Sequence, residues 1–234
     1  MWSKSRKRTA SALGAAALAA MLIAAALVKT APDVYSRTAR VGADHPGADR
    51  FNEEVVNGVG NVLLDKSGGT RLDVVITEEM ASARLVRFLE ERRARGDRLP
   101  VALAGLRIGF EPGRLVLATR MGRGLSSLVV SQHFSLLVME DGRLRMEPVG
   151  MRAGLLPLPV GLSRRLTQSL RVHLERLEAK GSRGTNLVLW RAALGALEGE
   201  PVALEGKKLG IRLERLEVER GRLHVVGRRS ERDD

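Results

Sequence analysis

The sequence predicts an α+β fold, with an N-terminal transmembrane helix followed by one domain that combines helices with a large antiparallel sheet. Three observations predict it. Residues 9–28 carry no charge and follow a basic cluster. Apolar residues recur at helical spacing before residue 100 and at alternating spacing after it. Turn glycines at positions 113, 142 and 221 are each followed by Arg and Leu, which is typical of β-hairpins.

The apolar run over residues 9–28 is long enough to cross a bilayer, because about 20 helical residues span the hydrocarbon core. The basic flank, residues 1–8, is expected in the cytoplasm, so the chain would be a single-pass protein of the inner membrane with its C-terminal domain outside. A cleaved signal peptide ending at Ala31 is the alternative, although Lys29 and Pro32 fit a cleavage site poorly. A buried soluble helix is the third interpretation, since ten of the twenty residues are alanine.

The rest of the chain is basic and contains no cysteine. Five of the 39 Lys and Arg residues belong to the membrane segment, which leaves 34 against 27 Asp and Glu, a net charge of +7. Such a surface favours anionic partners. Without cysteine there are no disulfides or thiolate sites. The two Trp, one Tyr and four Phe are too few for base stacking, so nucleic acid is not expected as a partner.

The sequence predicts a helix, a strand and a second helix in the first part of the domain. Residues 29–48 mix Pro, Gly and Asp without apolar periodicity and predict a linker, after which the domain covers residues 49–228 and a charged tail residues 229–234. A helix is expected from Phe51 and a strand over residues 71–76.

Thr77 then predicts a helix N-cap. Glu78 and Glu79 occupy the first turn of that helix, where the helix dipole favours negative charge, and Gly96 ends it.

The three turn glycines predict hairpins over residues 106–115, 135–144 and 213–223. Their unequal spacing, 29 and then 79 residues, favours one large antiparallel sheet over a repeated solenoid. Each glycine is expected to supply a positive φ at its turn. A slip in apolar parity between Leu213 and Leu216 predicts a β-bulge.

The returning strands of the first two hairpins are expected to bury one face only. Leu115 and Leu117 alternate with Val116 and Ala118, which are expected to face away from the core. Leu144 and Met146 alternate in the same way with arginines at positions 143 and 145.

Two further helices are expected, over residues 160–178 and from Thr185 or Asn186 to Leu197. The first has a leucine stripe with arginines off it. This pattern is typical of a helix packed on a core, and it is also typical of a helix lying in a membrane interface.

No residues assemble a catalytic or metal site in the sequence, so an enzyme, a cofactor and a metal are not expected. The four histidines, His45, His133, His173 and His224, have no metal-ligand spacing, and no nucleophile is paired with a base. The paired glutamates are adjacent in helices, where neighbours point about 100° apart, so none forms a carboxylate dyad.

Three motifs occur in order along the chain. They are Ile76-Thr-Glu-Glu-Met80 opening a helix, the Gly-Arg-Leu hairpin turns, and residues 149–159, which end in Leu-Pro-Leu-Pro159. Over roughly residues 50–228 this pattern resembles bacterial membrane-anchored proteins of the YpmS-like and LmeA-like kind. The resemblance implies a tubular lipid-binding (TULIP-like) domain, in which a long twisted antiparallel sheet curls around helices and leaves an apolar groove. It implies binding or carriage of lipids at the cell envelope, without catalytic residues.

The expected function is therefore to bind a lipid or lipid-linked envelope molecule by burying its acyl chain. The alternative is a non-catalytic envelope scaffold that recruits a protein partner through its basic surface. The candidate groove wall consists of Leu85, Phe88, Leu89, Leu115, Leu117, Leu144 and Met146. The candidate headgroup ligands are Arg120, Arg164 and Arg165.

Overall fold

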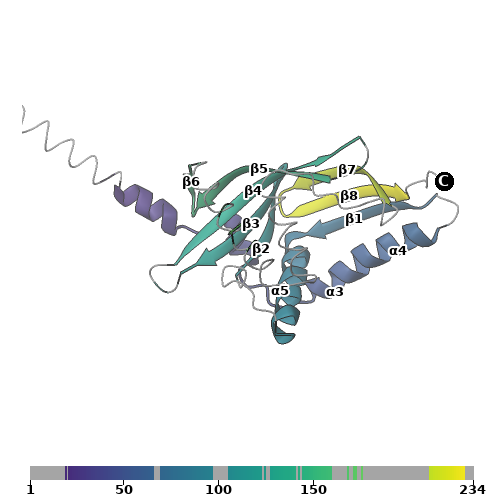
Figure 1. Ribbon diagram of the computed structural model, residues 1–234, viewed down its shortest axis with the longest axis horizontal. Helices are drawn as coiled ribbons and strands as arrows, with labels where there is room; N and C mark the ends of the chain where they lie inside the picture. Colours follow the sequence, from purple (N-terminus) through teal and green to yellow (C-terminus); the bar gives the residue numbers. More distant parts are fainter. Residues whose placement is uncertain are drawn as a thin grey trace, which may run out of the picture.

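A computed structural model describes residues 19, 21–65, 69–96, 105–122, 124, 127–140, 142, 144–159, 168, 171, 172, 175 and 211–229. The described part is α+β and elongated, with two antiparallel sheets placed end to end (Figure 1). One sheet has five strands in the order β2-β3-β4-β5-β6, and the other has three in the order β1-β8-β7. Helices α3 and α4 run beneath the three-stranded sheet, and α5 lies near the junction (Figure 1).

The five-stranded sheet is built from the first two predicted hairpins. Its strands are β2 (Arg107–Glu111), β3 (Arg114–Met121), β4 (Leu128–Val138), β5 (Leu144–Ala153) and β6 (Leu156–Leu158). All its neighbouring strands are antiparallel. Gly113 and Gly142 have φ values of 70° and 76°, which confirms the predicted turns.

A short helix, α2 (Asp33–Thr38), packs on β2 and β3 on one side of this sheet. Gly109 on β2 makes the contact possible, because a Cβ there would lie 1.8 Å from Cγ1 of Val34. Beneath α2, Val116 and Ala118 are fully buried. These two residues do face away from Leu115 and Leu117, but the prediction that only one face of the strand is buried is wrong, since α2 covers the other.

The expected linker over residues 29–48 is therefore part of the packed domain. Val34, Tyr35, Thr38, Val41 and Ala48 are all buried there. Isolated apolar residues without a period carried too little signal to predict this packing.

The three-stranded sheet combines β1 (Arg71–Thr77) with the third hairpin, β7 (Ile211–Glu219) and β8 (Arg222–Arg229). The expectation of one large sheet is thus corrected to two. The third hairpin pairs with β1, and the sheets meet where the Gly113 amide donates to Val218 O and the Gly221 amide to Phe110 O. The register of β7 shifts between Leu213 and Arg215, which confirms the predicted bulge.

A nearly continuous helical segment packs on one face of this smaller sheet. It consists of α3 (Gly47–Phe51), a π-helical turn η1 (Asn52–Val56) and α4 (Asn57–Leu64). Val62 of α4 forms a core cluster with Leu72, Val74 and Ile211. Because these are apolar side chains from three different elements, their burial attaches the helical segment to the sheet.

Helix α5 (Glu78–Ala94) begins where β1 ends. The Thr77 hydroxyl accepts a hydrogen bond from the Met80 amide at 3.2 Å, which confirms the predicted N-cap. One turn later, Ser82 Oγ donates to Ile108 O at 2.8 Å and accepts from Ile108 N at 3.0 Å. A single serine thus satisfies both backbone groups of Ile108 at the open edge of β2, as an edge strand requires.

The structure corrects the transmembrane helix of the predicted fold class. Within the described residues no helix is both long and apolar enough to cross a membrane. Residues 19 and 21–29 are helical there. The end of this segment contacts the β5–β6 turn, where the Leu155 amide donates to Leu27 O at 2.9 Å. Residues 9–18 and 20 of the predicted span lie outside the described residues.

Of the helix predicted over residues 160–178, the structure describes residues 168, 171, 172 and 175, each of which is helical. The helix predicted from Thr185 or Asn186 to Leu197 lies outside the described residues, as do the tail after Arg229 and His173.

Candidate functional site

The four predicted groove residues from the sheet lie on one face of the five-stranded sheet. Leu115 pairs with Phe134, and Leu117 with Gln132. Residues paired in an antiparallel ladder point to the same face. Leu144 pairs with Val138 of β4, and Met146 pairs with Leu136. Since Leu136 and Val138 have the same parity along β4 as Phe134, both pairs lie on this face.

We call this surface the apolar sheet face. The strand register assigns to it Ile108, Phe110, Leu115, Leu117, Thr119, Met121, Leu128, Val130, Gln132, Phe134, Leu136, Val138, Leu144, Met146, Pro148, Met151, Ala153, Leu156 and Leu158. None of these residues is charged.

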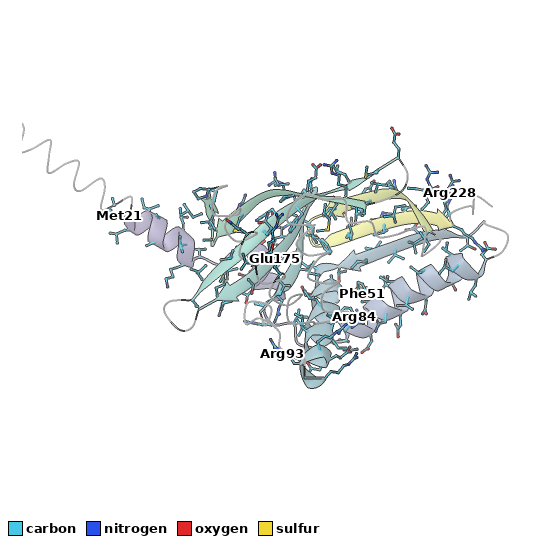
Figure 2. All side chains as sticks on the ribbon, in the orientation of Figure 1. Met21, Phe51, Arg84, Arg93, Glu175 and Arg228 are labelled. Carbon is cyan, nitrogen blue, oxygen red and sulfur yellow. The ribbon has the colours of Figure 1, made fainter. Side chains whose placement is uncertain are left out.

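Burial varies along the apolar sheet face, where Phe110 and Phe134 are each 1% exposed and the leucines beside them are more open. On the side beneath α2, Val116 is 0% exposed and Val129 is 4% exposed. On the apolar sheet face, Leu115, Leu117, Leu144 and Met146 are only half-buried. Large aliphatic side chains therefore remain partly open on one side, and Figure 2 shows side chains standing on both sides of the strands.

The predicted helix residues lie on α5, the helix that packs against the edge strand β2. Leu85 and Phe88 are half-buried and Leu89 is buried. At 100° per residue, Leu85 and Phe88 project from the flank of α5 opposite Ala83 and Arg87. Those two face α3, since Ala83 packs on Ala48 and Arg87 pairs with Asp49. The guanidinium of Arg92 lies over the Phe88 ring, 5.2 Å from its centroid.

The predicted headgroup arginines are not brought to the apolar sheet face. Arg120 shares the opposite side of β3 with Ala118, and its guanidinium lies over the ring of Tyr35 at 5.6 Å. Arg164 and Arg165 lie outside the described residues. On the described strands the structure gives this face no cation for an anionic headgroup.

One polar side chain stands in the middle of the apolar sheet face, and sequence reasoning missed it. Gln132 is 7% exposed, and its Oε1 atom is buried without a hydrogen-bond partner. Its Nε2 donates to His133 O at 3.4 Å. The signal was present in the sequence, because residues 128, 130, 134, 136 and 138 of the same parity are all apolar.

On the α2 side of the sheet, the next residues along β4 bring a serine, a histidine and a carboxylate together. His133 Nε2 lies 3.2 Å from Ser131 Oγ, and Nδ1 lies 3.5 Å from Glu111 Oε2, too far for a good hydrogen bond. Burial lowers the pKa of His133 below its ordinary value of 6.5. Ser131 is 0% exposed, so no substrate reaches its hydroxyl, and the group is structural rather than nucleophilic.

A separate cleft of about 300 Å³ lies between α3 and the start of α5. Its lining includes the side chains of His45 and Arg50 and the carboxylates of Glu54 and Glu79. None of the predicted groove residues lines it. Across the described residues, no group of three or more His, Asp or Glu side chains is placed to hold a metal ion.

No protein-family model, curated protein or solved structure matches the chain.

Proposed function

We propose that the protein binds the acyl chain of a lipid or lipid-linked molecule on the apolar sheet face. The observation that carries the proposal is the difference between the two sides of β3. Val116 and Ala118 are fully buried beneath α2, whereas Leu115 and Leu117 are only half-buried. At this part of β3 the larger aliphatic side chains are more open than the smaller residues on the other side, which leaves apolar area that a ligand can cover.

The composition of the face favours an uncharged, elongated ligand. Removing apolar surface from water contributes about 0.8 kcal/mol per buried methylene group, and the face has no charge on its described strands that an apolar chain would have to desolvate. The resemblance to YpmS-like and LmeA-like proteins supports the same class of ligand and an envelope location. No residues on the face suggest chemistry, so we propose binding or carriage rather than catalysis.

Native mass spectrometry of the purified full chain tests this proposal. We expect one lipid-sized adduct per chain, which solvent extraction removes and added fatty acyl probes replace. A chain that carries no adduct and takes up no acyl probe after extraction would contradict the proposal.

The scaffold alternative is favoured by a different surface. Arg71, Arg228 and Arg212 are in direct register across the three-stranded sheet, and all three are exposed. Arg228 lies at the end of the molecule far from Met21 (Figure 2). Like charges placed opposite one another are destabilising, so this arginine row favours an acidic partner.

Two arginines of this row already have partners in the same chain. Arg228 pairs with Glu214 at 3.1 Å, and Arg212 donates to Glu140 O at 2.6 Å. An acidic partner would compete for these arginines. The scaffold alternative predicts that exchanging Arg71 and Arg228 for Gln weakens partner binding, whereas the lipid proposal predicts that the same exchange leaves bound lipid unchanged.

A further inference from the structure

The cleft beside the start of α5 shares no residue with the apolar sheet face and carries charges of both signs. Its volume of about 300 Å³ lies at the lower end of the range of about 300 to 1,000 Å³ that is typical of small-molecule sites. Three helical elements supply its charged side chains: Arg50 of α3, Glu54 of η1 and Glu79 of α5. All three residues are exposed, so a small charged molecule can reach them from solution.

Charged residues next to the cleft are paired, whereas those that line it are not. Asp49 and Glu78 each form an ion pair with an arginine on another element. The residues that follow them, Arg50 and Glu79, line the cleft. Within the part of the chain that the structure describes, neither of these two nor Glu54 has an ion pair or a side-chain hydrogen bond. One cation and two carboxylates are therefore available to a ligand in the same cleft.

Arg50 and Glu54 are four residues apart, the spacing at which opposite charges pair on an α-helix. They nevertheless stay separate, and the π-helical turn η1 begins between them at Asn52. Turns of this kind are rare and occur frequently at functional sites.

One wall of the cleft is held in place by Gly47. This residue lets α3 approach α5 closely, because a Cβ there would lie only 3.2 Å from Cα of Met80. The Gly47 amide also donates to His45 Nδ1 at 3.1 Å. A neutral His45 ring therefore carries its proton on Nε2 and keeps a hydrogen-bond donor for another group.

We infer that the cleft binds a short zwitterion, with a primary ammonium group on Glu54 and Glu79 and a phosphate or carboxylate on Arg50 and His45. Hydrogen bonds between ionised groups are about twice as strong as neutral ones. The carbon link between the two groups lies against Val75, which lines the cleft and is 40% exposed. A quaternary ammonium group fits less well, because the lining contains no Phe, Tyr or Trp among the described residues.

Matched probes test the inference on the full chain by isothermal titration calorimetry. O-phosphoethanolamine and β-alanine are zwitterions, whereas ethyl phosphate lacks the ammonium group and ethylamine lacks the anion. We expect a zwitterion to bind about tenfold more tightly than either singly charged probe, which is the effect of one charge-assisted hydrogen bond. Vesicles of phosphatidylethanolamine and phosphatidylcholine in equal parts distinguish the source of the ligand. A site for a lipid headgroup binds these vesicles as well as the soluble probe, and a site for a free molecule binds the soluble probe alone.

Two variants assign the charges. Glu54→Gln should weaken binding of the zwitterion about tenfold without weakening that of ethyl phosphate, and Arg50→Gln should do so without weakening that of ethylamine. The matched control is Glu53→Gln, since Glu53 is exposed in the same turn but does not line the cleft. It should leave the binding of every probe unchanged. All three side chains are exposed, so the melting temperature should stay the same.

The inference is overturned if the wild-type chain binds neither zwitterion, or if it binds a singly charged probe equally tightly. It is also overturned if Glu53→Gln weakens binding as much as Glu54→Gln, because general surface charge rather than the cleft would then account for it. These results do not involve the acyl probes, whose uptake on the apolar sheet face tests the proposed function separately.

Discussion

Arg37 on α2 and Glu78, the first residue of α5, form a bidentate ion pair. Together with the Phe110 amide it links α2, α5 and β2. The Nε of Arg37 pairs with Oε1, and its Nη2 lies 3.0 Å from Oε2. The Glu78 side chain is only 6% exposed, and Oε2 also accepts from the Phe110 amide of β2 at 3.4 Å. The pair therefore holds α2 against the same part of the sheet that α5 contacts.

Replacing Arg37 with Met should destabilise the fold by about 2 kcal/mol, measured by urea unfolding. Removing one partner of a fully buried pair costs about 3 to 5 kcal/mol because a buried charge is left alone, and the cost here is lower because Arg37 keeps some contact with water. Asp33→Ala is the matched control, since Asp33 also pairs with Arg37 but is exposed. It should change stability little. Equal effects of the two substitutions would contradict the structural role of Glu78.

Leu117→Trp should abolish lipid binding while leaving the melting temperature within a few degrees of the wild type. The reason is that Leu117 is half-buried on a face that has room for a ligand. Val116→Trp is the control, because Val116 is 0% exposed beneath α2. Overpacking there should cost about 1 to 3 kcal/mol or more. Thermal unfolding and native mass spectrometry measure both effects. A large loss of stability in Leu117→Trp, with no lipid in either protein, would favour the scaffold alternative.

Gly109→Ala should destabilise the domain by about 2 kcal/mol, because its new methyl group would overlap Val34. Val34 approaches Gly109 from α2 so closely that the helix would have to shift. Val34→Ala on its own should be destabilising, since it removes buried methyl groups. The double variant should nevertheless be more stable than Gly109→Ala alone, as measured by denaturant unfolding. Additive losses would show that the two residues do not touch.

Features set by neighbouring residues could be predicted from the sequence. The Thr77 cap, the turn at Gly113 and the bulge after Leu213 follow from local chemistry or from a change in period, and the structure confirms each. The placement of α2 over the sheet could not be predicted, because it depends on Val34 meeting Gly109, far along the chain. The separation into two sheets likewise depends on β1 pairing with β8.

The candidate site, too, could be predicted from the sequence only in part. Alternation along β3 predicted that Leu115 and Leu117 share a face, and alternation along β5 predicted the same for Leu144 and Met146. The strand register places both pairs on one face of the sheet. The side on which Arg120 lies also follows from parity, since Arg120 and Leu117 differ by an odd number of positions. Gln132 required the structure, because the sequence shows its parity but not that Oε1 lacks a donor.

The stability of the protein should fall between pH 7 and pH 5, and His133 should account for part of the fall. Burial is the main cause of its lowered pKa; Glu111 opposes the shift, and Arg152 and Arg114 add to it. In the unfolded chain the histidine takes up a proton near its ordinary pKa of 6.5, whereas in the folded protein it stays neutral to lower pH. The stability contributed by the neutral ring is therefore complete above pH 6.5 and is lost as the pH falls toward the folded-state pKa.

His133→Gln removes the titrating group and should flatten this dependence. In the wild type each pH unit below about 6.5 should cost up to about 1.4 kcal/mol, until the folded-state pKa is reached. The pKa of Asp33 and that of Asp49 are lowered from 3.8 by their arginine partners, so their contribution is lost only at lower pH and does not overlap this window. Urea unfolding of both proteins at pH 7, 6 and 5 measures the difference. Parallel curves would mean that His133 is already free to take up a proton in the folded state, which its 4% exposure argues against.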